Sequence, residues 1–213
     1  MTSARGKFIT VEGIEGTGKS TQFGFLTEQI EERGHTVFRT REPGGTPMAE
    51  RVRRILLDID QEPMPEIAEL LLFFASRSLH LQNAILPALA RGEWVLCDRF
   101  TDTSRAYQGS GRGLDMAQIE TLAGWVQGEI EPDLTILLDA PVEIGLERAK
   151  LRGEVDRMDS QALEFYRRAR QSYLELAEGF PERFEVVDAS VEIVAVQASI
   201  KRVLQKTLFN NKD

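Results

Sequence analysis

The sequence has little that would suit an oxidising or a membrane environment. With one cysteine among 213 residues, Cys97, the chain cannot form an internal disulfide. The apolar neighbours of Cys97 favour a buried structural thiol over a nucleophile. No apolar run is long enough to span a bilayer, and the N-terminus has no apolar signal region. We therefore expect a cytoplasmic protein that does not enter a membrane.

An excess of positive charge is also missing. The formal net charge is −8, whereas proteins that bind nucleic acids through the phosphate backbone are normally basic. The arginines are nevertheless concentrated in three segments, residues 39–54, 99–112 and 148–170. Local arginine clusters on an acidic protein fit small anionic ligands better than long polyanions, so we expect no nucleic-acid partner.

Short apolar runs alternate with longer amphipathic segments, which is typical of an α/β fold. This alternation predicts one domain, residues 1–213, with a five-stranded parallel sheet and helices on both faces. The expected strands are residues 7–12, 36–40, 94–98, 134–139 and 184–188. The expected helices are residues 19–33, 46–58, 65–91, 115–129, 142–151, 160–178 and 191–208.

Residues 13–20 read Gly-Ile-Glu-Gly-Thr-Gly-Lys-Ser, which matches the phosphate-binding P-loop pattern G-x-x-x-x-G-K-[ST]. The glycines let backbone N–H groups converge on a polyphosphate. Lys19 supplies a positive charge for the β- and γ-phosphates, and Ser20 a hydroxyl for Mg²⁺. The expected strand before the loop and helix after it turn the pattern into a candidate phosphate site. A Gly-rich helix cap is the alternative.

Further polar residues follow two other expected strands, and ligands bind at this edge of an open α/β sheet. Asp98 and Arg99 end the third strand, where an acid can hold the Mg²⁺ shell and an arginine can bind phosphate oxygens. A helix N-cap and a surface arginine are the simpler alternatives. Residues 41–46, Arg-Glu-Pro-Gly-Gly-Thr, form a rigid turn after the second strand.

Three segments suggest ligand contacts but also have simpler interpretations. Phe73 and Arg77 share a helix face and could form one wall of a base pocket, although spacing alone favours a core phenylalanine and a partly buried arginine. Residues 103–113 offer polar donors for a nucleoside or form a solvated loop. Residues 148–157 are rich in cations around Gly153, which suits a mobile lid over a polyphosphate or a solvated helix end.

Taken together, these motifs resemble the bacterial thymidylate kinase family. The P-loop alone indicates only a nucleoside-phosphate enzyme. The proline–diglycine turn, the Asp98-Arg99-Phe100 segment and the Tyr-Gln-Gly-Ser-Gly-Arg-Gly stretch at 107–113 are more specific, and the similarity extends from Phe8 to about Ala189. The resemblance implies a P-loop kinase fold, a lid at about residues 148–160, transfer of phosphate from ATP with Mg²⁺ to dTMP to give dTDP, and a homodimer.

The resemblance also implies roles for individual residues. In some family members an arginine stands where this chain has Gly16, and this chain resembles the subtype whose lid provides that arginine instead. The implied catalytic residues are Lys19, Arg99, Arg152 and Arg157. ATP would contact Gly13, Ile14, Glu15, Gly16, Thr17, Gly18, Lys19, Ser20 and Thr21. The dTMP site would contain Glu15, Arg41, Phe73, Arg77, Arg99, Ser104 and Gln108, and the metal site Ser20 and, through water, Asp98.

Two other functions share part of this pattern. A kinase for another nucleoside monophosphate would keep the same core, and a panel of monophosphates would separate the two. A GTPase-like switch would need the guanine-reading motif N-K-x-D, which is not found in the sequence.

Overall fold

The computed structural model describes residues 5–59, 62–152, 157–158 and 161–209. Its five strands form one parallel sheet in the order β2-β3-β1-β4-β5. The expected strands are confirmed to within one residue at each end. They are β1 (Phe8–Glu12), β2 (Val37–Arg41), β3 (Trp94–Asp98), β4 (Leu134–Asp139) and β5 (Phe184–Asp188).

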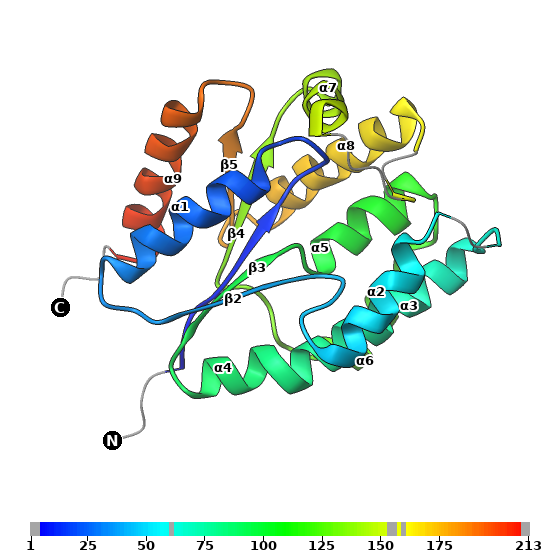
Figure 1. Cartoon of the computed structure of the whole chain (residues 1–213), viewed down its shortest axis with the longest axis horizontal. Helices are drawn as coiled ribbons and strands as arrows, with labels where there is room; N and C mark the ends of the chain where they lie inside the picture. Colours follow the sequence, from blue (N-terminus) through cyan, green and yellow to red (C-terminus); the bar gives the residue numbers. More distant parts are fainter. Residues whose placement is uncertain (1–4, 60–61, 153–156, 159–160, 210–213) are drawn as a thin grey trace.

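Helices cover both faces of the sheet, as expected (Figure 1). Because strand side chains alternate between faces, Ile9 and Val11 pack toward α1 (Lys19–Glu31) and α9 (Ile193–Thr207), whereas Phe8 packs toward Leu81 and Ile85 on the other face. That second face also carries α8 (Leu163–Gly179), which packs against Leu137 of β4. None of the described helices is long and apolar enough to cross a membrane.

The helix expected over residues 65–91 is a single helical run with an irregular middle. It consists of α3 (Glu66–His80), a π-helical segment η1 (Leu81–Ile85) and α4 (Leu86–Ala90). The irregular turn lies directly before Pro87, which has no N–H to donate and whose ring does not fit a regular helical turn. The other expected helices are α2 (Pro47–Leu57), α6 (Met116–Gln127) and α7 (Val142–Arg152), together with α1, α8 and α9, with ends shifted by at most three residues.

The sequence analysis was wrong about residues 101–111, where it expected no helix. This segment forms α5 (Thr101–Ser104) and the π-helix η2 (Arg105–Gly111), and most of it is buried. The glycines that argued against a helix have a packing role. A Cβ on Gly109 would lie 2.9 Å from Met116, and one on Gly111 would lie 2.6 Å from Phe165. The helix can therefore pack closely only because these positions have no side chain.

Candidate active site

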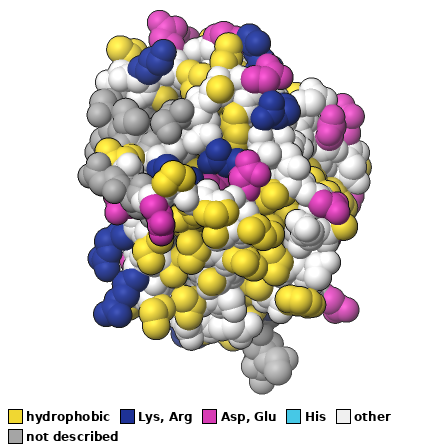
Figure 2. All heavy atoms as spheres, turned by 90° about the vertical axis from the view of Figure 1, so that its right-hand side faces the viewer, with side chains coloured by type: hydrophobic (Ala, Val, Ile, Leu, Met, Phe, Trp, Pro, Cys, Tyr) yellow, Lys and Arg dark blue, Asp and Glu magenta, His cyan; other side chains and the backbone are white. Residues whose placement is uncertain are grey.

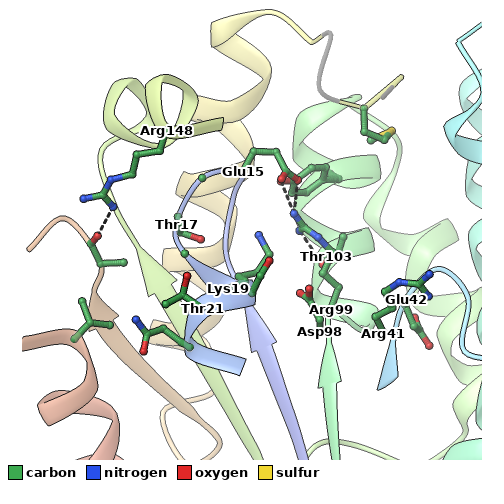
Figure 3. A pocket seen from close by; sticks show the side chains of 18 of the residues that line it. Glu15, Thr17, Lys19, Thr21, Arg41, Glu42, Asp98, Arg99, Thr103 and Arg148 are labelled. Atoms are coloured by element: carbon green, nitrogen blue, oxygen red, sulfur yellow. Dashed lines mark hydrogen bonds and ion pairs between the residues drawn. The ribbon is translucent and has the colours of Figure 1, made fainter. Parts of the chain in front are cut away.

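A cavity of about 820 Å³ opens beyond the carboxyl ends of β1, β2 and β3 (Figure 3). Its wall is formed by the loop after β1, the turn after β2, the end of β3 and the loop after β5. This is the edge at which open parallel sheets bind ligands. The predicted site residues that line it are Glu15, Gly16, Thr17, Gly18, Lys19, Ser20, Thr21, Arg41, Phe73, Asp98 and Arg99.

The loop between β1 and α1 has the conformation of a phosphate cradle. Gly13, Gly16 and Gly18 have φ angles of 142°, 73° and 86°, in a region that favours glycine. The N-cap of α1 is Gly18, which has no side chain to accept hydrogen bonds from the first N–H groups of the helix. These groups therefore remain available to an anion in the cavity. The glycines predicted from the motif are therefore required by the backbone itself.

Lys19 is the buried cation of this loop. Its Nζ donates to the carbonyl oxygens of Gly13 at 3.0 Å and Ile14 at 2.9 Å. Burial lowers the pKa of Lys19, and the positive charge of Arg99 lowers it further. A polyphosphate in the cavity would offer this ammonium anionic oxygens in place of neutral carbonyls. Gly13 and Ile14 thus hold Lys19 by their backbone and lie outside the cavity wall.

Gly16 has a second function that the motif did not reveal. A Cβ on Gly16 would lie 1.7 Å from the carbonyl oxygen of Gly145 in α7, and a Cβ on Gly145 would lie 2.5 Å from the carbonyl oxygen of Glu15. The P-loop and α7 therefore touch backbone to backbone. This contact holds α7, the helix that leads into the predicted lid segment, directly against the phosphate cradle.

Asp98 ends β3 and lines the same cavity as Ser20. Its Oδ1 is buried and has no hydrogen-bond partner among the described residues. A buried carboxylate oxygen without a partner is costly unless a ligand or water satisfies it. This oxygen and the Ser20 hydroxyl are both of the donor type that Mg²⁺ prefers.

Arg99 follows Asp98 and extends its guanidinium into the cavity (Figure 3). Its φ angle of 69° is unusual for a residue with a side chain, and such conformations are frequent at functional sites. Nη2 donates to Glu15 at 2.5 Å and to the Tyr107 hydroxyl at 3.3 Å, while Nη1 lies 3.4 Å from the hydroxyls of Thr103 and Tyr173. The ion pair brings together two residues predicted for the acceptor site.

Glu12, at the end of β1, lies directly behind Arg99. It accepts hydrogen bonds from the Phe100 N–H at 2.7 Å, the Thr103 hydroxyl at 2.6 Å and the Tyr173 hydroxyl at 2.8 Å. Burial and the nearby charge of Asp102 raise the pKa of Glu12 to about 7. Because Thr103 and Tyr173 also contact Arg99, this carboxyl group helps to fix the guanidinium that enters the cavity.

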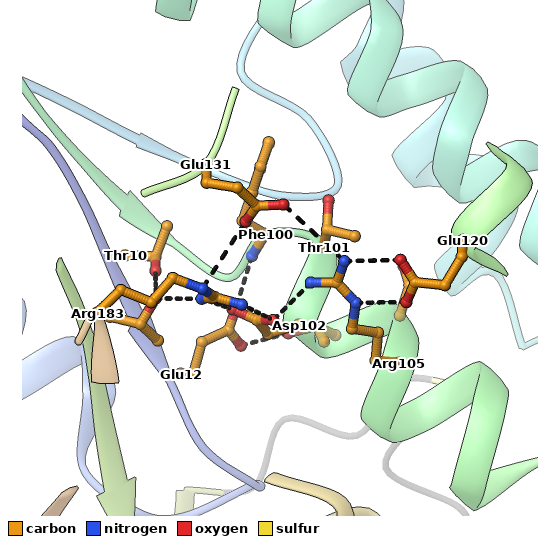
Figure 4. Close-up of polar contacts among 12 residues, drawn as sticks. Thr10, Glu12, Phe100, Thr101, Asp102, Arg105, Glu120, Glu131 and Arg183 are labelled. Atoms are coloured by element: carbon orange, nitrogen blue, oxygen red, sulfur yellow. Dashed lines mark hydrogen bonds and ion pairs between the residues drawn. The ribbon is translucent and has the colours of Figure 1, made fainter. Parts of the chain in front are cut away.

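A buried ionic network anchors the same segment from below (Figure 4). Asp102 accepts two hydrogen bonds from Arg183, at 2.6 and 2.9 Å, and one from Arg105 at 2.8 Å. Arg105 is in turn held by both oxygens of Glu120 in α6. The sequence analysis missed this network, and no local pattern could have found it, because Asp102 and Arg183 are 81 positions apart.

The turn after β2 closes the opposite side of the cavity. Arg41 lines the cavity and pairs with Glu50 at 2.6 Å, and Glu50 also accepts the N–H of Gly45 at 2.8 Å. Phe73 of α3 lines the cavity with 5% of its surface exposed. Both residues are therefore in reach of a ligand in the cavity, and their contact with dTMP remains a prediction.

Three other residues predicted to contact the substrate are buried behind the wall. Arg77 donates to Glu42 at 2.7 Å, to Ser104 at 3.1 Å and to the Phe100 carbonyl at 3.1 Å. Ser104 and Gln108 are fully buried and do not line the cavity. Gln108 Oε1 has no hydrogen-bond partner among the described residues. Direct contact of Arg77, Ser104 and Gln108 with a ligand remains a prediction.

Of the two predicted lid arginines, Arg157 is the one whose side chain the structure describes. Arg157 lies 2.7 Å from the buried Glu69, donates to a backbone carbonyl of α2 at 2.8 Å, and does not line the cavity. Arg152 is the last residue of α7, and its side chain lies outside the described part of the chain, as do residues 153–156. The position of Arg157 favours an anchoring role for it in this conformation.

The chain is similar to known proteins over nearly its whole length. The thymidylate kinase family profile matches residues 11–200. A thymidylate kinase of Chromohalobacter salexigens is 54% identical over 205 residues, and one of Ectopseudomonas mendocina is 52% identical over 203 residues. Each match covers 95% of this chain and 97% of the relative. The crystal structure of thymidylate kinase from Ehrlichia chaffeensis has a TM-score of 0.77 and 33% identity, covering 94% of this chain and 100% of that chain.

Proposed function

Because this chain belongs to the thymidylate kinase family, we propose that it transfers the γ-phosphoryl group of ATP to dTMP, giving dTDP and ADP. The observation that carries the proposal is one cavity that joins a P-loop with a buried lysine to the Arg99–Glu15 pair. Phosphoryl transfer requires the alignment of donor and acceptor and the neutralisation of charge on the transferring oxygens. The two halves of the cavity offer these two functions.

The P-loop half binds the donor. The N–H groups of residues 13–20 hold the phosphates of ATP, and Lys19 exchanges its two carbonyl partners for phosphate oxygens. Ser20 and the unpartnered oxygen of Asp98 would hold Mg²⁺, Asp98 through water. When bound, the ion neutralises charge on the donor phosphates.

The other half binds and orients the acceptor. Arg99 binds the dTMP phosphate, and Glu15 approaches the sugar 3′-hydroxyl. Phe73 stacks on thymine, and Arg77 faces its O4. No general base is needed, because the acceptor oxygen is already an anion. Arg41, Ser104 and Gln108 complete this half.

The lid supplies the remaining charge. In our proposal, residues from about 148 to 160 act as the lid of a single kinase domain, and Arg152 supplies its charge to the transferring group. The contact between Gly16 and Gly145 supports this role, since it docks α7, which leads into the segment, on the P-loop. Closure would also exclude water, which could otherwise hydrolyse ATP.

The activity is tested with a coupled ADP-release assay in which dTMP, dUMP, dCMP, AMP and GMP are offered in turn as the acceptor. We expect kcat/KM to be highest for dTMP, and turnover to require Mg²⁺. A higher kcat/KM for AMP or GMP would replace the proposed acceptor with a purine monophosphate. ADP release that is independent of every monophosphate would indicate an ATPase.

We also propose that the protein is a cytoplasmic homodimer. Figure 2 shows a broad apolar area on the side of the molecule where α2, α3 and α6 lie in Figure 1. Apolar patches of this kind commonly mark protein interfaces. The exposed apolar side chains of these helices include Ile55, Ile67, Leu71, Met116 and Trp125.

Sedimentation velocity tests the dimer. Leu71→Asp should shift the wild-type dimer to a monomer, because a charge would be placed in an apolar contact. The matched control is Val194→Asp, on an exposed position of α9 at 76% exposure, which should stay dimeric. A monomeric wild type would rule the dimer out.

A further inference from the structure

A chain of hydrogen-bonded side chains lies behind the acceptor half of the cavity, and its inner member is His80. Nε2 of His80 lies 2.6 Å from the Thr40 hydroxyl, and Nδ1 lies 3.1 Å from Oε1 of Glu42. Oε2 of the same carboxylate accepts the Nε–H of Arg77 at 2.7 Å. His80 is completely buried, and Arg77 and Glu42 are 1% and 4% exposed. These hydrogen bonds therefore link Thr40 of β2, through His80 and Glu42, to Arg77 of α3. Arg77 is the residue predicted to contact the base of the nucleotide.

The partners of His80 determine where its proton lies. The carboxylate of Glu42 can only accept hydrogen bonds, so Nδ1 of His80 must be the donor. The Thr40 hydroxyl can donate to Nε2, which satisfies the second nitrogen of the ring. A ring with a proton on Nδ1 thus meets both neighbours.

This arrangement leaves Glu42 little freedom to rotate. One carboxylate oxygen is bound to His80 and the other to Arg77, and the N–H of Glu42 donates to the Asp98 carbonyl at 2.9 Å. Arg77 is fixed in turn, because three of its five N–H groups donate to Glu42, Ser104 and a carbonyl.

His80 also supports the turn after β2. A Cβ on Gly45 would lie 2.4 Å from the His80 ring, so the ring packs directly on the backbone of this turn. The N–H of Gly44 donates to Ser76, one turn earlier in α3. The same turn carries Arg41 and Glu42, both of which line the cavity (Figure 3).

We propose that His80 is a positioning residue for the monophosphate-binding half of the cavity, acting through Glu42 on Arg77 and on the turn at 42–45. His80 does not line the cavity, so it acts only through these neighbours. The inference rests on the proposed function, in which Arg77 faces the base of the acceptor. It assigns a task to a residue that the sequence analysis did not single out.

Steady-state kinetics with His80→Phe and His80→Asn tests the assignment. Phenylalanine keeps a ring but cannot donate to Glu42, so KM for dTMP should rise about tenfold and the preference for dTMP over dCMP should fall. KM for ATP should stay within about twofold, because the P-loop lies in the other half. In His80→Asn the side-chain amide can restore the donor, so KM for dTMP should return toward the wild-type value. His35→Phe is the matched control, since His35 stacks on Trp94 and Phe209 away from the cavity and should change neither KM.

The ring nitrogens can be observed directly, because His35 and His80 are the only histidines. In ¹⁵N spectra of the wild type, we expect His80 to show a protonated Nδ1. Its signals should move on addition of dTMP but not of ATP, whereas those of His35 should not move. Thr40→Val removes the hydroxyl at Nε2 and provides a second variant if His80→Phe does not fold. It should raise KM for dTMP in the same direction by a smaller factor.

Two results would overturn the inference. One is a folded His80→Phe or Thr40→Val variant with an unchanged KM and base preference. The other is an equal loss for ATP and dTMP, which would make His80 a general packing residue. Failure of the proposed function is distinguishable. If the wild type prefers another monophosphate in the panel, the acceptor assignment is wrong, while a selective KM effect on that monophosphate would still identify His80 as a positioning residue.

Discussion

The two halves of the cavity are built in different ways. In the donor half, the ligand-binding groups belong mainly to the backbone, and glycines at 13, 16 and 18 set its path. In the proposed acceptor half, the groups are side chains held by other side chains, such as Arg77 by the buried Glu42 and Arg99 by the half-buried Glu15. The donor half therefore depends on local conformation, and the acceptor half depends on contacts between distant segments. Substitutions in the two halves should therefore impair different properties of the protein, such as kcat or the affinity for dTMP.

The largest effect should come from Lys19→Ala. Loss of a charge in a desolvated phosphate site is worth a few kcal/mol, so kcat should fall by about 10²–10⁴. Affinity for dTMP should survive, because Lys19 is not among the residues proposed to bind dTMP. Turnover assays and calorimetric titration with dTMP separate the two quantities.

Lys201→Ala, on the exposed surface of α9, is the control for that experiment and should behave as wild type. Near-normal turnover in Lys19→Ala would contradict the P-loop assignment. Joint loss of kcat and dTMP affinity would contradict the separation of the two halves.

The second comparison is between two lid arginines. Arg152→Ala should lower kcat by about 10³ and leave dTMP affinity nearly unchanged, because a lid arginine acts mainly in the transition state. Arg157→Ala removes one of the two arginine partners of buried Glu69 and leaves Arg112, so it should lower thermal stability more than kcat. Kinetics and thermal melting of both variants check this.

If kcat falls further in Arg157→Ala than in Arg152→Ala, then Arg157 has the catalytic role and Arg152 does not. That result would mean that Arg157 leaves Glu69 when the lid closes over the nucleotides.

A smaller effect is expected on stability, where alanine at Gly16 should cost more than alanine at Gly18 of the same loop. Both Gly16 and Gly18 have positive φ, so alanine costs about 1–2 kcal/mol at either position. Only at Gly16 would the new methyl group meet the Gly145 carbonyl, which should add about 1–3 kcal/mol. Gly18→Ala, with nothing within 4 Å, is the matched control. Denaturant unfolding without ligand measures the difference, and equal losses would show that α7 does not press on the P-loop.

The smallest effect concerns the ion pair at the edge of the acceptor half. The hydrogen bonds and charge of Arg41 hold the pKa of Glu50 at about 2. Because this pKa is lower in the folded state than the ordinary 4.5, the pair stabilises the protein above pH 4.5, and the contribution is lost as the pH falls toward 2. Glu50 is 37% exposed, so the gain is only about 0.2–1 kcal/mol.

Unfolding curves at pH 7 and pH 3 measure this contribution. Glu50→Gln should be slightly less stable than wild type at pH 7, and the difference should shrink at pH 3. A difference that grows toward pH 3 would mean that the pair is not the source of the pH dependence.

The same contrast explains how much could be predicted from the sequence. The P-loop could be predicted because a left-handed turn needs glycine. The position of Asp98 and Arg99 at the end of a strand could be predicted because a buried strand needs apolar residues in a row. The five strands were predicted to within one residue for the same reason.

The helix at 101–111 and the buried partners of the acceptor half were not readable. Gly109 and Gly111 look like loop residues until Met116 and Phe165 are seen against them. Glu12 meets Tyr173 across 161 positions, and Arg77 meets Glu42 across 35. Such pairs depend on the tertiary fold, and a single sequence carries no local signal for them.

The contact of Gly16 with Gly145 constrains how sequences of this kind can diverge. An arginine at position 16 cannot be introduced by one substitution while α7 stays docked, because even a methyl group there would meet a backbone carbonyl. Moving the proposed catalytic arginine from the lid to the P-loop would require α7 to shift as well. The two positions should therefore be epistatic: a change at 16 would be tolerated only on a background in which the start of α7 has already moved.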